Sequence, residues 1–108
     1  MNKVPLEEIY IAARENDIGR LQAALSAGQH LSMQRPENGF TPLHTAALNG
    51  SVDFIQEALK HPSADPWLRD HAGRLAIDHS DVRREYTISR LFFDAMYPEG
   101  RLPHPVDP

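Results

Sequence analysis

Small and apolar residues recur along the chain with a spacing of 34 residues. Within each copy they stand at positions i, i+3 and i+4, as Leu43, Ala46 and Ala47 do, and this spacing places them on one face of an α-helix. A repeat of about this length is typical of helical units that stack side by side. The chain is therefore predicted to contain three copies of one unit. The matching positions are Ile9, Leu43 and Ile77; Ala12, Ala46 and Ser80; Ile18, Val52 and Tyr86; and Leu25, Leu59 and Phe93.

Each copy is expected to hold two short helices joined by a tight turn. In the first copy one helix opens at Pro5 and the second covers residues 18–27. In the second copy the helices cover residues 42–49 and 52–60, and the final helix of the third copy covers residues 86–96. The side chains expected to face the interior are Leu6, Ile9, Ala12, Ala13, Leu21, Ala24, Leu25, Leu43, Ala46, Ala47, Phe54, Ile55, Ala58, Leu59, Ile88, Phe92 and Phe93.

The centre of the second copy carries strong signals for where a helix starts and ends. Thr41 is a good N-cap, because its hydroxyl can accept from a backbone amide of the first turn. Pro42 suits the first helical position, where its missing N–H is no loss. Gly50 can end the helix in the left-handed region. Before the cap, residues 36–39 read Pro-Glu-Asn-Gly, which predicts a tight turn closed by Gly39.

The second copy contains the stretch Gly39-Phe40-Thr41-Pro42-Leu43-His44-Thr45-Ala46-Ala47, followed by Gly50. This stretch resembles the ankyrin repeat pattern G-x-T-P-L-H-x-A-A-x-x-G at every fixed position. The resemblance implies an all-α solenoid of three stacked helix-turn-helix units with projecting hairpin loops. It also implies a structural role for His44, which would bond the Thr41 hydroxyl and nearby backbone. The repeats are expected at about residues 5–38, 39–72 and 73–97, as one domain over residues 1–97.

Residues 98–108 form a proline-rich tail, with four of the nine prolines. Proline cannot continue a helix, so an extended or disordered end is expected. A role as a polyproline-like ligand is an alternative. Part of the tail could also fold back over Phe92 or Tyr97.

Ser89, in the final helix, stands where the earlier copies carry an apolar residue. A polar residue at this position fits the polar outer side of a last repeat.

Composition and charge exclude several classes of protein. Charged residues make up 24% of the chain and the formal net charge is −4, so a clustered basic footprint for DNA or RNA is missing. No apolar run approaches the roughly 20 residues that a membrane helix needs. No cysteine is present, which excludes disulfides and thiolate metal sites. We expect a cytoplasmic monomer that binds neither nucleic acid nor membranes.

Catalytic and metal-binding signals are weak. The six histidines include no pair at helical i, i+3 or i, i+4 spacing, so no metal or cofactor is expected. The run Asp78-His79-Ser80 contains the residue types of a hydrolytic triad. Successive helical residues point about 100° apart, however, so these three side chains are not expected to meet. The chain is predicted not to be an enzyme.

The resemblance places a partner-binding surface on the loop tips and on the exposed side of the first helices. Interface hot spots are enriched in tryptophan, tyrosine and arginine. Trp67, Phe40, Arg69 and Arg74 are therefore the expected anchors, with Phe40 exposed. The alternative for Trp67 is packing across the loop bases, onto Leu68 or the previous loop. The full candidate set is Glu37, Asn38, Phe40, Leu48, Asn49, Trp67, Arg69, His71 and Arg74.

These observations predict a non-enzymatic protein-binding module. The resemblance implies a concave groove that holds a protein partner, as a small inhibitor or neutraliser or as an adaptor. The negative net charge mildly favours a basic partner. Two alternatives remain: a structural protein that self-associates through an incompletely capped end, and an accessory subunit of an enzyme.

Overall fold

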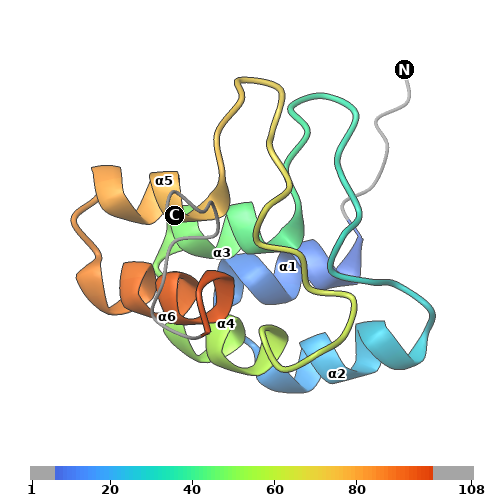
Figure 1. The fold of residues 1–108 in the computed structure, drawn as a ribbon. Coiled ribbons are helices and arrows are strands. Elements are labelled where there is room, and N and C mark those ends of the chain that lie inside the picture. The colour runs from blue at the N-terminus through green and yellow to red at the C-terminus, as the bar shows by residue number, and fades with distance from the viewer. Residues whose placement is uncertain (1–6, 99–108) are drawn as a thin grey trace.

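Six helices form three antiparallel pairs in the computed structural model, which describes residues 7–98. Figure 1 shows α1, α3 and α5 in one row and α2, α4 and α6 in a second row beside it. Each helix packs on its own pair and on its neighbours along the row. The helices are α1 (Glu8–Glu15), α2 (Ile18–Ser26), α3 (Pro42–Asn49), α4 (Val52–Ala58), α5 (Ala76–Val82) and α6 (Tyr86–Met96).

Two long connections rise from the helix rows as neighbouring fingers. Residues 27–41 join α2 to α3, and residues 59–75 join α4 to α5 (Figure 1). The three stacked helix pairs with projecting loops confirm the predicted all-α solenoid. None of the helices within residues 7–98 is long and apolar enough to cross a membrane.

The predicted helix bounds hold best where the capping signals are strongest. The bounds of α3 and α6 are confirmed, and Thr41 caps α3 by accepting from the backbone N–H of His44. The opening of α1 at Pro5 is wrong: the helix begins at Glu8, after Glu7 in an extended conformation. Helices α2 and α4 end one and two residues earlier than expected, at Ser26 and Ala58. The tail expectations for 99–108, and Leu6, lie outside the described residues.

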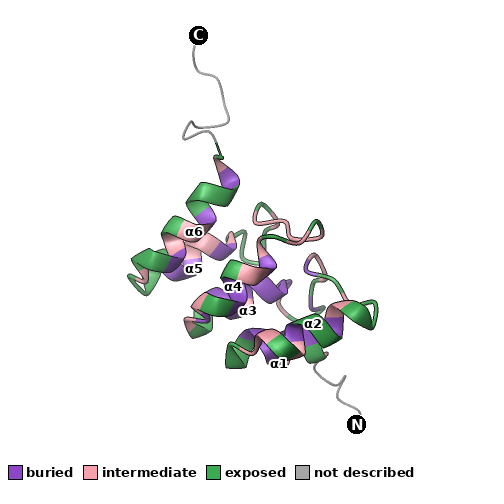
Figure 2. Cartoon of the chain, turned by 90° about the horizontal axis from the view of Figure 1, so that it is seen from below, coloured by how far each residue is buried: buried purple, intermediate pink, exposed green. Residues whose placement is uncertain are grey.

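The core lies where the two helix rows meet. The buried positions include Ile9, Leu43 and Ile55, as their helical spacing predicted. Figure 2 shows that buried residues line the sides along which neighbouring helices pack, while much of α6 is exposed. Phe92 is fully buried, but the prediction that Phe93 faces inward is wrong, because its side chain is 38% exposed.

Phe93 is exposed because α6 has packing partners on one side only within residues 7–98. It contacts α5 and α4, and no further described helix lies beyond it. Adjacent helical residues point about 100° apart, so Phe92 can face the core while Phe93 faces outward. Ser89 bonds Ser80 at 2.8 Å and the Asp81 carboxylate.

One position in each of the first two repeats links the first helix of the repeat to the next loop. In α1 the Tyr10 hydroxyl donates to the Phe40 carbonyl at 2.7 Å, and also approaches the Met33 carbonyl at 3.1 Å. In α3 the equivalent residue, His44, uses Nε2 to reach the Arg74 carbonyl at 2.9 Å. Burial raises the pKa of Tyr10 above its ordinary value, so the hydroxyl keeps the proton that it donates. Each of these two repeats is thereby tied to the base of the loop that leads into the next one.

The tie at Tyr10 is testable by removing its hydroxyl. Tyr10→Phe should lower the free energy of unfolding by about 1–2 kcal/mol, because a buried hydrogen bond is lost without a change in ring packing. Urea unfolding followed by circular dichroism measures this. Tyr86→Phe is the matched control, since Tyr86 is 65% exposed. Equal stability of the two variants would contradict a role for the Tyr10 hydroxyl between repeats.

The turns within the three helix pairs share one left-handed residue. Asn16, Gly50 and Arg84 occupy equivalent positions, with φ of 57°, 70° and 59°. An arginine in this region is unfavourable by roughly 1 kcal/mol relative to glycine. Arg84→Gly should therefore raise the free energy of unfolding by about 1 kcal/mol and the melting temperature by several degrees.

The neighbouring Arg83 provides the control for this substitution. Its φ is −82°, in the ordinary helical region. Arg83→Gly should leave stability unchanged or lower it by up to ~1 kcal/mol, because glycine gains nothing at that conformation. A stabilisation by Arg83→Gly equal to that by Arg84→Gly would show that charge removal, and not backbone conformation, causes the effect.

Candidate functional site

A pocket of about 390 Å³ opens between the two finger loops and above the start of α5. We call it the loop pocket. Five of its residues belong to the predicted partner-binding set. The lining residues are Glu37, Asn38, Phe40, Asp70, His71, Ala72, Arg74 and His79.

The two loops that form the loop pocket are joined to each other. The backbone N–H of His71 donates to the Asn38 carbonyl at 2.9 Å. The Gln34 side-chain amide donates to the carbonyls of Gly39, in its own loop, and of Arg69, in the next loop, at 3.0 and 2.9 Å. These bonds hold the walls of the pocket at a fixed separation.

Gly39 is required at the closest approach of the loops. Its φ is +74°, and a Cβ at this position would lie 2.5 Å from the His71 ring and 2.7 Å from the His71 backbone nitrogen. Both the backbone conformation and the space therefore exclude a side chain. The predicted turn over residues 36–39 is confirmed, with the Gly39 N–H donating to the Arg35 carbonyl at 2.7 Å.

Phe40 forms an apolar side of the loop pocket. Its ring stacks on His44 with centroids 5.4 Å apart and meets His79 edge-on at 5.2 Å. The prediction that Phe40 is exposed is wrong: it is only half-exposed, because rings from α3 and α5 pack against it. A half-buried ring can still offer one edge to a bound side chain.

Asp70 fixes the shape of the second loop from inside. One of its carboxylate oxygens accepts from the backbone N–H groups of Ala72 and Arg74, both at 2.9 Å. The other carboxylate oxygen pairs with Nε2 of His79 at 2.9 Å. Burial by itself raises the pKa of Asp70, but the amide bonds and the His79 bond outweigh it, so the pKa lies below its ordinary value. The carboxylate therefore stays charged and bonded.

His44, Asp70 and His79 come together as a buried cluster of the residue types that bind metals. Their potential ligand atoms all lie within 4.8 Å of one another. Hydrogen bonds already use both nitrogens of His44 and both oxygens of Asp70. A bound ion would have to displace the bond between His44 and the Arg74 carbonyl. The arrangement is that of a structural network.

Spacing along one helix could not have revealed this cluster. His44 lies on α3, Asp70 in the second loop and His79 on α5, so only the stacking of two repeats brings them together. The expected role of His44 is confirmed: its Nδ1 lies 2.8 Å from the Thr41 hydroxyl and accepts from the Thr41 N–H.

The charged side chains of the loop pocket differ in whether they have an ion-pair partner within residues 7–98. Glu37 is paired with Arg35 at 2.9 Å, and Arg35 also pairs with Glu7 at 2.8 Å and lies over the Tyr10 ring. The exposed guanidinium of Arg74 makes no ion pair within residues 7–98. Arg74 is therefore the charge that the pocket can offer to a partner.

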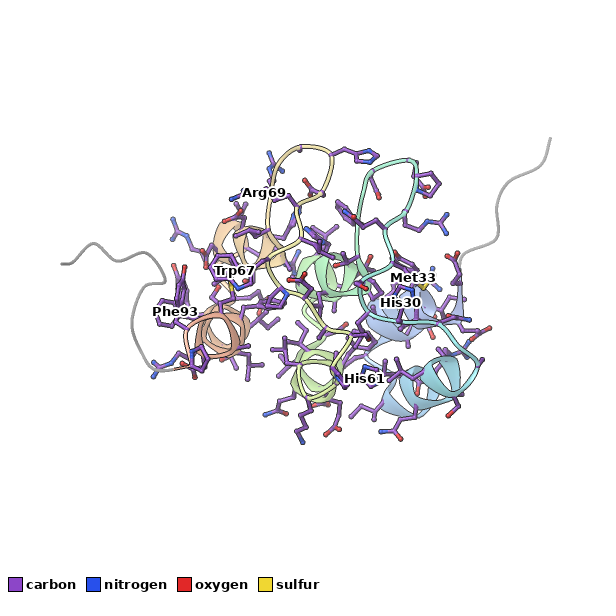
Figure 3. The ribbon with its side chains drawn as sticks, turned by 45° about the vertical axis from the view of Figure 1, so that its right-hand side comes forward. His30, Met33, His61, Trp67, Arg69 and Phe93 are labelled. Atoms are coloured by element: carbon purple, nitrogen blue, oxygen red, sulfur yellow. The ribbon has the colours of Figure 1, made fainter. Side chains whose placement is uncertain are left out.

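Four predicted residues lie outside the loop pocket. Leu48 and Asn49 are exposed at the end of α3. Trp67 and Arg69 lie in the second loop, and Figure 3 shows Trp67 near Phe93. Trp67 is 42% exposed and packs edge-on against Tyr97, with ring centroids 5.5 Å apart. Two of the four predicted anchors thus pack on different rings: Phe40 on His44 and His79, and Trp67 on Tyr97.

The sequence interpretation missed Asp70 and His79 as parts of the pocket. The pattern indicates Asp70 only as a loop residue, and it groups His79 with its helical neighbours Asp78 and Ser80. The 34-residue spacing aligns His79 with Thr45 on α3, which does not line the pocket, so the repeat pattern carries no signal for these two residues.

The sequence comparisons agree with the stacked helix pairs. Residues 9–59 match the family described as Ankyrin repeats (many copies). Residues 9–59 of the chain belong to the ankyrin repeat family. In this ankyrin-repeat protein the matched region covers the first two helix pairs, including the Thr41 and His44 network.

Known ankyrin-repeat relatives are much longer than the segments they share with this chain. The 2-5A-dependent ribonuclease of Homo sapiens is 36% identical over 62 residues, which are 57% of this chain and 8% of the ribonuclease. Ankyrin repeat domain-containing protein 49 of Bos taurus is 36% identical over 61 residues, 56% of this chain and 26% of that protein. ARF GTPase-activating protein GIT2 of Mus musculus is 24% identical over 91 residues, 84% of this chain and 13% of that protein.

The buried His44 makes the stability of this ankyrin-repeat protein depend on pH. Burial lowers the pKa of His44 below its ordinary value of 6.5, so the folded ring stays neutral where the unfolded one takes a proton. Stability from His44 should be complete above pH 6.5 and should fall, by about 1 kcal/mol per pH unit, as the pH decreases toward the folded pKa.

Urea unfolding at pH 7.5 and 5.5, for the wild type and His44→Gln, measures this contribution. Glutamine does not titrate, so the variant should lose less stability on acidification than the wild type. Equal losses in the two proteins would assign the pH dependence to other groups.

Proposed function

We propose that this chain is a non-enzymatic protein-binding module whose contact site is the loop pocket. Ankyrin repeats in general bind proteins. The observation that supports this site is the combination of Arg74, which makes no ion pair with residues 7–98, and the exposed part of the Phe40 ring. Arginine and aromatic side chains are the residue types most enriched at interface hot spots.

The loop pocket is held in shape before any partner arrives. The bonds of His71 to Asn38 and of Gln34 to Arg69 join the loops, and Asp70 fixes the second loop. A site that is already ordered loses little conformational entropy on binding. This rigidity supports recognition of a folded partner or of an extended segment without rearrangement of the loops.

Charge acts on a partner at two ranges. The net charge of −4 favours the approach of a basic protein through long-range attraction. Arg74 offers a short-range contact to a carboxylate of that partner. The proposed partner therefore presents a basic surface with an acidic or carbonyl group where it enters the loop pocket.

We propose an inhibitor or adaptor role, in a cytoplasmic monomer, in keeping with a chain that lacks cysteine. Two of the relatives are named as a ribonuclease and a GTPase-activating protein, but this chain matches only 8% and 13% of their lengths. That similarity carries no activity to this chain. A structural, self-associating role is the alternative, and a role as the accessory subunit of an enzyme is a minor one.

A pull-down from native lysate with matched variants tests the loop pocket. Arg74→Ala with His71→Ala removes one cation and one polar ring from the pocket. Lys60→Ala with Gln56→Ala is the control, because both residues are exposed on the opposite row, in α4 and just after it. A protein bound by wild type and control should be lost from the pocket variant, with its affinity reduced by about 2 kcal/mol or more.

Two other outcomes would contradict the proposal. Retention of the same proteins by the pocket variant would place binding elsewhere. Recovery of the chain alone, with a molecular mass in solution above that of the monomer, would favour the structural, self-associating role. Circular dichroism of each variant checks that the helices are intact.

A further inference from the structure

Three aromatic side chains form a contact surface away from the loop pocket. The rings of Phe93 and Tyr97 lie 4.7 Å apart, and Tyr97 meets Trp67 at 5.5 Å. Trp67 is 42% exposed and Phe93 38%. We call this surface the aromatic face. Figure 3 shows Trp67 and Phe93 together on the side formed by the second loop and α6.

The aromatic face occupies positions that are better covered in the earlier repeats. Trp67 is equivalent to Met33, and Phe93 is equivalent to Leu25 and Leu59. Met33, Leu25 and Leu59 are all partly buried against the core. Trp67, in the loop before α5, and Phe93, on α6, are thus larger than their counterparts and leave more of their apolar surface uncovered.

The segments that follow α2 and α4, the second helices of the first two repeats, lie against each other. The Leu31 N–H donates to the Ser63 hydroxyl at 3.0 Å, and Gln34 reaches the Arg69 carbonyl at 2.9 Å. Residues 61–69, which come after α4, therefore run beside residues 31–34, which come after α2. The same step of 34 residues aligns the segment after α6 with the one after α4.

The sequence after α6 suits an aromatic surface. Tyr97 is equivalent to Ser63, and Leu102 is equivalent to Leu68, which directly succeeds Trp67. From there the chain reads Leu102-Pro103-His104-Pro105-Val106. Residues before proline favour extended backbone, and extended proline-containing segments bind surfaces lined by aromatic rings.

We propose that the aromatic face is the docking site of the chain's own residues 99–106. The segment continues the repeat pattern along the outer side of the second loop, as residues 61–69 do along the first. Leu102, Pro103 and Pro105 cover the rings of Trp67 and Phe93. The loop pocket takes no part in this contact, so the two proposals are independent of each other.

Linkage within one chain favours this contact. The proposed segment begins at residue 99, two residues after Tyr97, whose ring packs against that of Trp67. A short tether gives an effective concentration of the order of millimolar, so contacts with a dissociation constant of about that value or lower are occupied. Separate proline-rich peptides would need a comparable concentration to compete.

Fluorescence of Trp67 tests the proposal directly, because the chain contains one tryptophan. The full chain is compared with a chain that ends at Pro98, and circular dichroism verifies that both keep the helical signal. The shortened chain should show emission at longer wavelength and stronger quenching by acrylamide, since Trp67 becomes more exposed. Unchanged emission and quenching would overturn the proposal.

A pair of full-length variants identifies the residues that make the contact. Pro103→Gly with Pro105→Gly should reproduce the effect of shortening the chain. Asp107→Gly with Pro108→Gly is the control and should behave as the wild type, because these residues lie beyond the proposed segment. Wild-type behaviour of the first variant would overturn the role of the two prolines.

Dilution separates this intramolecular contact from one between two molecules. The emission of the full chain should stay the same over a wide range of protein concentrations. A shift to longer wavelength on dilution would assign the segment on the aromatic face to a second copy, and would overturn the contact within one chain. Nuclear Overhauser effects between proline Hδ atoms and the Trp67 indole would identify the contact directly.

Discussion

The stack depends on hydrogen bonds that link one repeat to a backbone carbonyl at the base of the next loop. The Tyr10 hydroxyl reaches the Phe40 carbonyl and His44 Nε2 reaches the Arg74 carbonyl. Each of these carbonyls also accepts the N–H that closes its own hairpin, from Arg35 and Asp70 respectively. One atom therefore fixes both the loop and its position on the preceding repeat, so loop shape and repeat stacking are set together.

The loop pocket depends on this arrangement. Phe40 and Arg74, whose carbonyls receive the links, also line the pocket, where Phe40 supplies an aromatic ring and Arg74 a positive charge. No single repeat can form the pocket, because its walls come from two neighbouring loops. A change that loosens the stack should therefore also change the shape of the loop pocket, whereas changes at exposed side chains of the pocket should leave the stack intact.

Within residues 7–98, the third repeat lacks the hydrogen bond that ties each of the first two repeats to the following loop. Asp78 stands where Tyr10 and His44 do, but its carboxylate bonds back to the Leu75 N–H at the start of its own helix. The repeat holds itself together without reaching a further described loop. The aromatic face, where the second loop meets α6, leaves Trp67 and Phe93 partly exposed. The Leu75 N–H at the start of α5 therefore has a hydrogen-bond partner, whereas the aromatic rings beside α6 are incompletely covered.

The sequence by itself determined the repeat, the helix pairs and most of the core, because the 34-residue period and the caps at Thr41 and Gly50 act through local backbone geometry. It also indicated five of the eight residues of the loop pocket. Only the tertiary structure decided that Phe40 is half-buried, that Asp70 meets His79, and that Trp67 packs on Tyr97. These contacts join residues from different helices and loops, and their distances depend on how the repeats stack. A periodic pattern shows which side of a helix is apolar, but not which neighbour will cover it.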